Sequence, residues 1–355
     1  MGYTIKDIAL KLGVSTAAVS KALNGKSDVS EELKEKVKKV AEEFGYSPNY
    51  FAKKLATNKS GIIGVFILGR EELGISEHFG FRFLEGILES ANKNGFDITL
   101  FSSSEERSYK KICEEKRVEG TIFIGLRSDT KFIDDIKSIE IPVVSIDYEI
   151  HGKNSVYVGS NNSNGVHKGM EYLWDLGHRN IGIVKAYKES EVGEKRFKSF
   201  KTFLKEKKYF NKDFIFEGDY TKESGYKAGI MVAELDNRPT ALFCVSDLMA
   251  IGVIDGLKTK GLSVPNDISV LGFDNINAGE HITPTLSTIA QNAFRIGESA
   301  VISIIDRING KTCKNSFEIE PRLLERESCR KIWNWRYKNG KSSTKGFGKD
   351  ISKWV

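Results

Sequence analysis

The stretch TIKDIALKLGVSTAAVSKALNG, residues 4–25, predicts two short helices joined by a tight turn. Thr4 precedes a run in which apolar residues recur at helical spacing, and Gly13 suits a turn. Ser15 is a good N-cap for the second helix, and Ser30 for a third. Three helices in this order are typical of a helix-turn-helix domain that binds DNA. A generic three-helix bundle would show a similar pattern.

The exposed side of the second helix carries small or hydrogen-bonding side chains, which are Thr16, Ala17, Ser20, Lys21 and Asn24. Such a face suits a recognition helix, because this helix must enter a DNA major groove about 12 Å wide and contact base edges there. The alanines on the other side of the helix allow it to pack close to the first helix. The pattern therefore favours DNA recognition by residues 16–24.

Positive charge lies at the two ends of the chain. The net charge is +6 overall, with +4 over residues 1–60, −4 over residues 61–330 and +6 over residues 331–355. A length of 355 residues is sufficient for two or three domains. This distribution fits a basic DNA-binding end attached to a nearly neutral body.

The sequence contains no apolar stretch long enough for a membrane span and no secretory signal at its N-terminus. The cysteines Cys113, Cys244, Cys313 and Cys329 are scattered and do not have the spacing of metal ligands. We expect a cytoplasmic protein with free thiols, no bound metal, no cofactor and no membrane partner. The sequence also lacks HExxH, Gly-x-Ser-x-Gly and P-loop motifs, so no catalytic residues are predicted.

The character of the sequence changes after Gly61. The run IIGVFIL is continuously apolar, as in a parallel strand that is buried on both faces. A helical segment and the strand DITLFSS follow, and the alternation continues through TIFIGL, PVVSIDY, SVYVGS, IGIVKA, ALFCVS and ISVLGF. Such alternation indicates doubly wound α/β layers, in which a ligand binds at the carboxyl ends of the strands.

The N-terminal stretch, followed by VSEELKEKV and FGYSPNYFAKKLA, resembles the lactose-repressor/galactose-repressor family of bacterial transcription regulators. The resemblance implies that Thr16, Ala17 and Lys21 read bases. It also implies that a further set of residues contacts phosphates or orients the domain; this set is Thr4, Ser15, Ser20, Asn24, Ser30, Tyr46 and Asn49.

The segment PNYFAKKLAT, residues 48–57, resembles the hinge helix of the same family. The resemblance implies that two copies of this segment fold together over the DNA minor groove. Leu55 would then wedge between base pairs, and an apolar wedge of this kind kinks the duplex. Ala52 would lie on the same apolar face as Leu55, and Lys53 would supply charge near the phosphates.

The resemblance continues through residue 330, with segments such as YLWDLGHRNIGIV, RPTALFCVSDLMAIG and VLGFDN. It implies a two-lobed α/β effector domain similar to periplasmic sugar-binding proteins. The residues that the resemblance places at the effector are Phe79, Asn164, Arg196, Tyr220, Ser246, Asp274 and Gln291. An arginine, a carboxylate and an aromatic ring together suit a sugar. The run TPTLSTI, residues 283–289, resembles nucleobase-responsive members equally well, so a nucleobase effector stays open.

We therefore expect a headpiece over residues 1–47, a hinge over 48–60, an effector and dimerisation domain over 61–330, and a flexible basic, aromatic extension over 331–355. The expected function is that of a regulator, most simply a repressor, which binds a near-palindromic operator in double-stranded DNA as a homodimer. Two copies are needed because one recognition helix reads too few base pairs. A sugar-binding module without a DNA role is the competing hypothesis.

Overall fold

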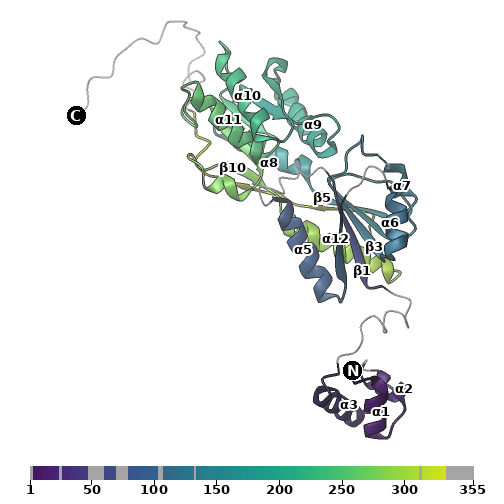
Figure 1. Ribbon diagram of the computed structural model, residues 1–355. Helices are drawn as coiled ribbons and strands as arrows, with labels where there is room; N and C mark the ends of the chain where they lie inside the picture. Colours follow the sequence, from purple (N-terminus) through teal and green to yellow (C-terminus); the bar gives the residue numbers. More distant parts are fainter. Residues whose placement is uncertain are drawn as a thin grey trace, which may run out of the picture. The chain divides into compact units, whose positions relative to one another are not determined.

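The computed structural model describes residues 3–23, 26–46, 60–68, 79–102, 107–131, 133–311 and 314–332. The chain divides into two compact units, Met1–Gly61 and Ile62–Val355 (Figure 1). Several residues with predicted roles lie outside the described residues, namely Asn24, Asn49, Ala52, Lys53 and Leu55. The extension lies outside them from residue 333 onward.

The described part of the first unit consists of the helices α1 (Ile5–Leu12), α2 (Thr16–Leu23) and α3 (Glu31–Glu43). Each helix contributes one fully enclosed aliphatic side chain to a common core, and these are Ile8, Val19 and Val37. Gly13, between α1 and α2, has a φ of 66°, which glycine adopts without steric cost. The three helices predicted from residues 4–45 are confirmed.

The second unit contains two lobes, each built around a parallel or mostly parallel sheet (Figure 1). In the described residues, the sheet of the first lobe has the order β11-β5-β4-β3-β1-β2, and all neighbours are parallel. Its strands are β1 (Ile62–Ile67), β2 (Asp97–Ser102), β3 (Gly120–Ile124), β4 (Val143–Ile146), β5 (Ser155–Ser160) and β11 (Ser316–Ile319). The helices of this lobe are α5 (Phe79–Lys93), α6 (Tyr109–Lys116), α7 (Ile133–Lys137) and α12 (Ala293–Ile308).

Helices cover both faces of this first sheet, which explains why its strands are continuously apolar. Ile63 and Val65 point to one face, where they share a core cluster with side chains of α5 and α12. Phe66 points to the opposite face, where it packs with side chains of α6 and α7. Successive side chains of a strand alternate between faces, so a strand covered on both sides has no polar face.

The sheet of the second lobe has the order β12-β10-β9-β8-β6-β7 in the described residues, and only β12 runs antiparallel to its neighbour. Its strands are β6 (Ile181–Lys185), β7 (Ile215–Glu217), β8 (Ala241–Cys244), β9 (Ser269–Asp274), β10 (Ser287–Ala290) and β12 (Arg322–Leu324). The helices of this lobe are α8 (Asn162–Asp175), α9 (Glu191–Glu206), α10 (Lys222–Glu234) and α11 (Asp247–Thr259).

Helices α10 and α11 cross through backbone-to-backbone contact. A Cβ atom on Gly252 of α11 would lie 2.0 Å from the carbonyl oxygen of Lys222 on α10. A Cβ atom on Gly225 of α10 would lie 2.1 Å from the carbonyl oxygen of Met249 on α11. Glycine, which has no Cβ atom, therefore allows the backbones of α10 and α11 to approach each other this closely.

The chain passes between the lobes at three places in the described residues. It leaves the first lobe after β5, returns from β10 to α12, and leaves again from β11 to β12. Figure 1 shows these segments lying between the two sheets. The carboxyl ends of β4, β9 and β10 therefore meet near the junction, where doubly wound sheets bind ligands.

The sequence-predicted strands are confirmed as β1 to β6, β8 and β9, within one or two residues at their ends. None of the helices in the described residues combines the length and the apolar character that a membrane span requires.

Candidate functional site

The caps of the first unit involve several residues that the resemblance assigned to DNA contact. The amide and the hydroxyl of Thr4 both donate to Asp7 at 2.7 Å, and these bonds lower the pKa of the Asp7 carboxyl. The Ser15 hydroxyl accepts from the Ala18 amide at 3.1 Å, at the start of α2. The Ser30 hydroxyl likewise accepts from the Leu33 amide at the start of α3. Thr4, Ser15 and Ser30 therefore cap the N-termini of α1, α2 and α3, and this role does not depend on any contact with DNA.

The first turns of α2 present a polar face to solvent. Thr16, Ala17 and Lys21 are exposed there, and Ser20 is half-buried. The Lys21 ammonium lies 2.5 Å from Asp28, and this hydrogen bond lowers the pKa of the Asp28 carboxyl. An exposed face that carries hydrogen-bonding groups and a cation is suited to the major groove of DNA. The half-buried Tyr46 packs against the core of this unit.

A narrow cleft lies between the two lobes of the second unit, with a cavity of about 80 Å³. Its lining comes from the carboxyl ends of β3, β4 and β9 and from the start of α9. Four residues predicted at the effector line this cavity, which are Arg196, Tyr220, Asp274 and Gln291.

Arg196 is the buried cation of the cleft, with only 2% of its surface exposed. Its Nε donates to Asn162 at 2.8 Å, and its Nη1 donates to the Val245 carbonyl at 2.6 Å. The same Nη1 lies 3.4 Å from Asp274, and the guanidinium stacks 3.7 Å from the centre of the Phe273 ring. The guanidinium is therefore held in one orientation from several sides, as a specific recognition group must be.

Two carboxylates flank Arg196, and both belong to residues with left-handed backbone. Asp147, after β4, has a φ of 65°, and Asp274, at the end of β9, has a φ of 124°. Burial raises the pKa of the Asp147 carboxyl to about 6, while the positive charge of Arg196 lowers it in part. Burial likewise raises the pKa of Asp274, again opposed by Arg196. Strained backbone beside buried charge is frequent at ligand sites.

Aromatic rings form another wall of the cleft. The Tyr220 ring packs edge-on against Tyr187, with 5.5 Å between the ring centres. The Tyr220 and Ser190 hydroxyls lie 2.7 Å apart, and burial raises the pKa of Tyr220 to about 12. The Arg127 guanidinium, which belongs to the first lobe, lies 4.6 Å from the centre of the Tyr187 ring.

Further contacts hold the lobes together at the rim of the cleft. The Ser128 amide of the first lobe donates to the Glu189 carbonyl of the second at 3.2 Å. The Glu149 amide donates to the Glu191 carboxylate at 3.0 Å. A cavity of about 80 Å³ is well below the roughly 300 Å³ or more of ordinary ligand pockets, so the cleft is closed in this conformation.

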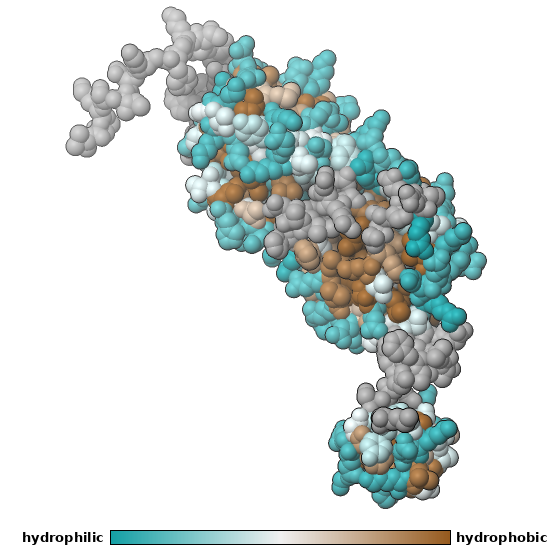
Figure 2. All heavy atoms as spheres, viewed as in Figure 1, coloured by the Kyte–Doolittle hydropathy of each residue, from teal (hydrophilic) through white to brown (hydrophobic). Residues whose placement is uncertain are grey.

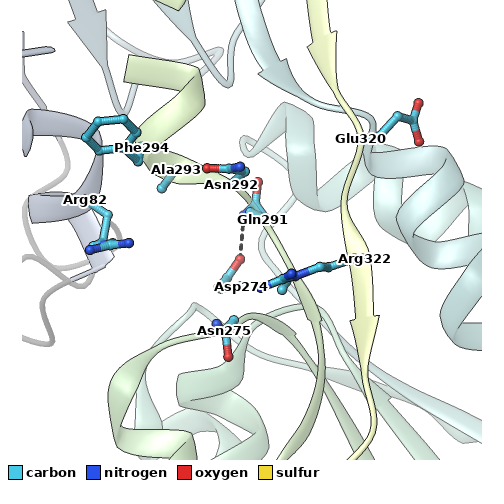
Figure 3. Close-up of a pocket in the computed structure, with 10 residues that line it drawn as sticks. Arg82, Asp274, Asn275, Gln291, Asn292, Ala293, Phe294, Glu320 and Arg322 are labelled. Carbon is cyan, nitrogen blue, oxygen red and sulfur yellow. Dashed lines mark hydrogen bonds between the residues drawn. The ribbon is translucent and has the colours of Figure 1, made fainter. Parts of the chain in front are cut away.

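A second, larger cavity of about 330 Å³ adjoins the cleft and shares Asp274 and Gln291 with it. Figure 3 shows the hydrogen bond between these two side chains, in which the Gln291 amide nitrogen donates to Asp274 at 2.7 Å. Arg82 and Arg322 point into the region on either side of this pair.

The structure does not bring all predicted effector residues together. Asn164 donates to Glu320 and lines neither cavity, and Ser246 caps α11 by accepting from the Met249 amide at 3.3 Å. Phe79 begins α5, and its side chain lies outside the described residues.

Sequence reasoning missed Asp147, Ser190 and Asn162. Asp147 carried a signal, because an acidic residue directly after a buried parallel strand lies at the ligand-binding edge. Ser190 and Asn162 carried no such signal, since their roles come from contacts with Tyr220 and Arg196, which are far from them in the sequence.

Two family models match the chain. The model for bacterial regulatory proteins of the lacI family matches residues 4–49, and the periplasmic binding protein-like domain matches residues 170–329. The HTH-type transcriptional repressor PurR of Pectobacterium carotovorum subsp. carotovorum (strain PC1) is 33% identical over 333 residues, which cover 92% of this chain and 96% of that protein. PurR of Vibrio vulnificus (strain CMCP6) is 32% identical, covering 93% and 99%.

The crystal structure of the lac repressor dimer bound to operator and the anti-inducer ONPF has the same fold, with a TM-score of 0.78 and 24% identity. That match covers 93% of this chain and 100% of that one. A helix-turn-helix unit followed by a two-lobed domain with a cleft between its lobes is the architecture of a class of DNA-binding transcription regulators. The chain belongs to the lacI family of bacterial regulatory proteins.

Proposed function

We propose that this protein represses transcription in the cytoplasm by binding a near-palindromic operator as a homodimer. A small molecule bound between the lobes shifts its affinity for DNA. The observation that carries the proposal is the buried Arg196, which lines the closed cleft and is oriented there by Asn162 and Asp274. The named relatives are transcriptional repressors rather than enzymes, which supports the same conclusion.

The effector class favoured by the relatives differs from the first sequence-based expectation, which was a sugar. The two curated relatives named above, which are at least 32% identical and cover more than nine-tenths of this chain, are PurR repressors. This supports the alternative hypothesis of a nucleobase or another non-sugar metabolite. The Tyr187 and Tyr220 rings in the cleft suit a flat heterocycle, and the carboxylates suit its N–H groups.

Titration of the purified protein with a labelled duplex at several salt concentrations tests the proposed function. A regulator that neutralises several phosphates loses affinity steeply as salt rises, because counterions are released on binding. A small-molecule-binding module without a DNA role would show no salt-dependent affinity for the duplex. Thermal unfolding in the presence of nucleobases and sugars would then identify the effector class, because a bound ligand raises the apparent stability.

Lys21→Ala is expected to weaken operator binding by about 1–3 kcal/mol and to relax specificity at one base position, because a direct contact to a base is lost. Fluorescence anisotropy with the operator and with single-base variants of it measures both effects. Lys36→Ala is the matched control, since Lys36 is also exposed and also paired, with Glu32 at 2.7 Å. An equal loss of affinity in both variants would mean that Lys21 contributes only through its positive charge and makes no specific contact to a base.

We propose α5 and the neighbouring edge strand β2 as the surface where two copies meet. Phe81 and Leu88 lie seven residues apart on one side of α5, and each is 53% exposed. Leu100 on β2 is 56% exposed. Figure 2 shows hydrophobic residues gathered on the lobe that contains α5 and β1. Exposed apolar side chains gathered in this way mark an interaction surface, and a palindromic operator requires a second copy.

Leu88→Glu is therefore expected to shift the protein from dimer to monomer, because it places a charge in an apolar interface. Operator affinity should fall together with the dimer population. Analytical ultracentrifugation over a range of protein concentrations measures the shift. Thr202→Glu, at an exposed position of α9 in the other lobe, is the control. A Leu88→Glu protein that dimerises like the wild type would exclude α5 and β2 as the dimer interface.

A further inference from the structure

The cavity of about 330 Å³ beside the cleft has the size of a ligand pocket, whereas the cleft itself encloses about 80 Å³. The cavity lies where the chain crosses between the lobes. Its walls are the ends of β9 and β10, the first turn of α12, the start of α5 and the crossing from β11 to β12. Asp274 and Gln291 line both cavities, so the larger space lies directly beside the cleft, on the other side of this hydrogen-bonded pair.

The cavity presents positive charge from three directions. Arg82 of α5 and Arg322 of β12 contribute guanidinium groups (Figure 3), and the exposed Arg82 also pairs through its Nη1 with Glu85 of the same helix at 2.9 Å. The third source is the N-terminus of α12, a helix of 16 residues whose residues Ala293 and Phe294 line the cavity. The Asn292 side chain caps the Arg295 amide at 3.1 Å, and the preceding first-turn amides have no acceptor within the helix. Such a helix end attracts anions.

The two carboxylates of the cavity do not cancel this charge. Glu320 accepts hydrogen bonds from Asn161 and Asn164, and it lies 3.5 Å from the Lys168 ammonium. Asp274 is already engaged by Gln291 and lies beside Arg196. Arg322 makes no ion pair with any described residue.

Gln291 supplies a separate indication of a ligand. Its side chain is nine-tenths buried and lines the cavity, and its amide nitrogen donates to Asp274. Its Oε1 has no hydrogen-bond partner in the part of the chain that the structure describes. A buried acceptor without a donor costs about 1–3 kcal/mol, so this oxygen is suited to receive a donor from a bound molecule.

We propose that the effector of this protein carries a phosphate group. The phosphate binds between Arg82 and Arg322 at the N-terminus of α12, and a hydroxyl of the same molecule donates to Gln291 Oε1. This inference rests on the proposed function, since it assigns the chemistry of the same effector. A phosphate offers three terminal oxygens to donors that converge from three sides, which a carboxylate cannot match. Two compound classes share this chemistry, namely sugar phosphates and nucleoside monophosphates.

Thermal unfolding and isothermal titration calorimetry at constant ionic strength test the proposal. The probes are ribose 5-phosphate, adenosine 5′-monophosphate, inorganic phosphate, ribose and adenine. We expect a phosphate compound to bind and to raise the unfolding temperature more than its unphosphorylated counterpart does. Binding of ribose 5-phosphate alone would assign a sugar phosphate, and binding of the nucleotide alone would assign a nucleotide. Absence of binding by every phosphate compound would overturn the proposal.

Arg322→Gln provides the second measurement, because it removes one charge from an exposed strand end without touching the core. It should weaken binding of the phosphate compound at least about tenfold, as expected for a lost charge-assisted hydrogen bond. Arg82→Gln should act in the same direction. Arg295→Gln is the matched control, because Arg295 is exposed on the first turn of α12, is paired with Glu298 and does not line the cavity. Equal affinity in Arg322→Gln and wild type would overturn the proposal.

Operator binding measured on the same preparations separates this proposal from the proposed function. If the protein binds its operator and responds to an unphosphorylated compound, the regulator stands and the phosphate site is excluded. If operator binding itself is absent, the proposed function fails.

Discussion

Asp274→Asn is expected to abolish the response of operator binding to effector while leaving the affinity for DNA unchanged. The carboxylate lines both cavities and offers acceptor oxygens beside Arg196, and an amide replaces one of these acceptors with a donor. The coupling between effector and operator, typically about 1–3 kcal/mol, should therefore be lost. Operator titration with and without effector measures this coupling directly.

The same substitution should change how stability depends on pH. Burial raises the pKa values of Asp274 and Asp147 in the folded protein, while an unfolded aspartate titrates near about 3.9. Between that value and the folded pKa, the folded state binds more protons, so the free energy of unfolding falls as pH rises. Asp274→Asn removes one such group, so its stability relative to wild type should rise by up to about 1.4 kcal/mol per pH unit in this window.

Urea unfolding at acid and neutral pH checks the second effect. Asp255→Asn is the control for both measurements, because Asp255 is a half-buried residue of α11 that pairs with Lys222 at 2.8 Å, outside the cleft. An Asp274→Asn protein with a normal effector response would remove Asp274 from the binding site. A stability curve parallel to that of the wild type would show that this carboxyl has an ordinary pKa.

Gly252→Ala is expected to destabilise the second lobe by about 3 kcal/mol. The added Cβ would lie 2.0 Å from the Lys222 carbonyl oxygen and 2.7 Å from the Tyr226 amide nitrogen, so the backbones of α10 and α11 must separate. In a helix without this contact, the same change would stabilise the protein by about 0.5–1 kcal/mol, because alanine is the better helix former. The sign of the effect therefore distinguishes the two cases.

Chemical denaturation measures this change, with Lys258→Ala as the control on the exposed side of α11. The control should alter the free energy of unfolding by less than about 0.5 kcal/mol. A Gly252→Ala protein as stable as the wild type would mean that the backbones of α10 and α11 leave room for a Cβ atom at this position.

The amino-acid sequence predicted the elements whose burial is regular. The strands β1, β3 and β5 are covered on both faces, so they appear as unbroken apolar runs. The strands β7, β10, β11 and β12, of three or four residues each, were not predicted, although β4 and β8 of the same length were, because the apolar runs around β4 and β8 are longer than the strands themselves. In β11 and β12 the burial pattern is also partly exposed, and such short segments leave no periodic signal.

The family resemblance predicted part of the effector site. Arg196, Tyr220, Asp274 and Gln291 line the cleft, and the resemblance had placed them at the effector. Asn162, rather than the predicted Asn164, reaches Arg196, because two residues along a helix rotate the side chain by about 200°. Only the three-dimensional packing decides which of these two asparagines faces the cleft.

The number of times the chain crosses between the lobes decides which lobe carries each end of the domain. An odd number of crossings in the described residues means that residue 62 opens the domain in one lobe and residue 332 closes it in the other. The first unit is therefore connected to the lobe of β1, whereas residue 332 lies on the lobe of β12. A donor dye on the first lobe and an acceptor attached at residue 332 would consequently record a change in the distance between the lobes as a change in energy transfer, with no label on the first unit.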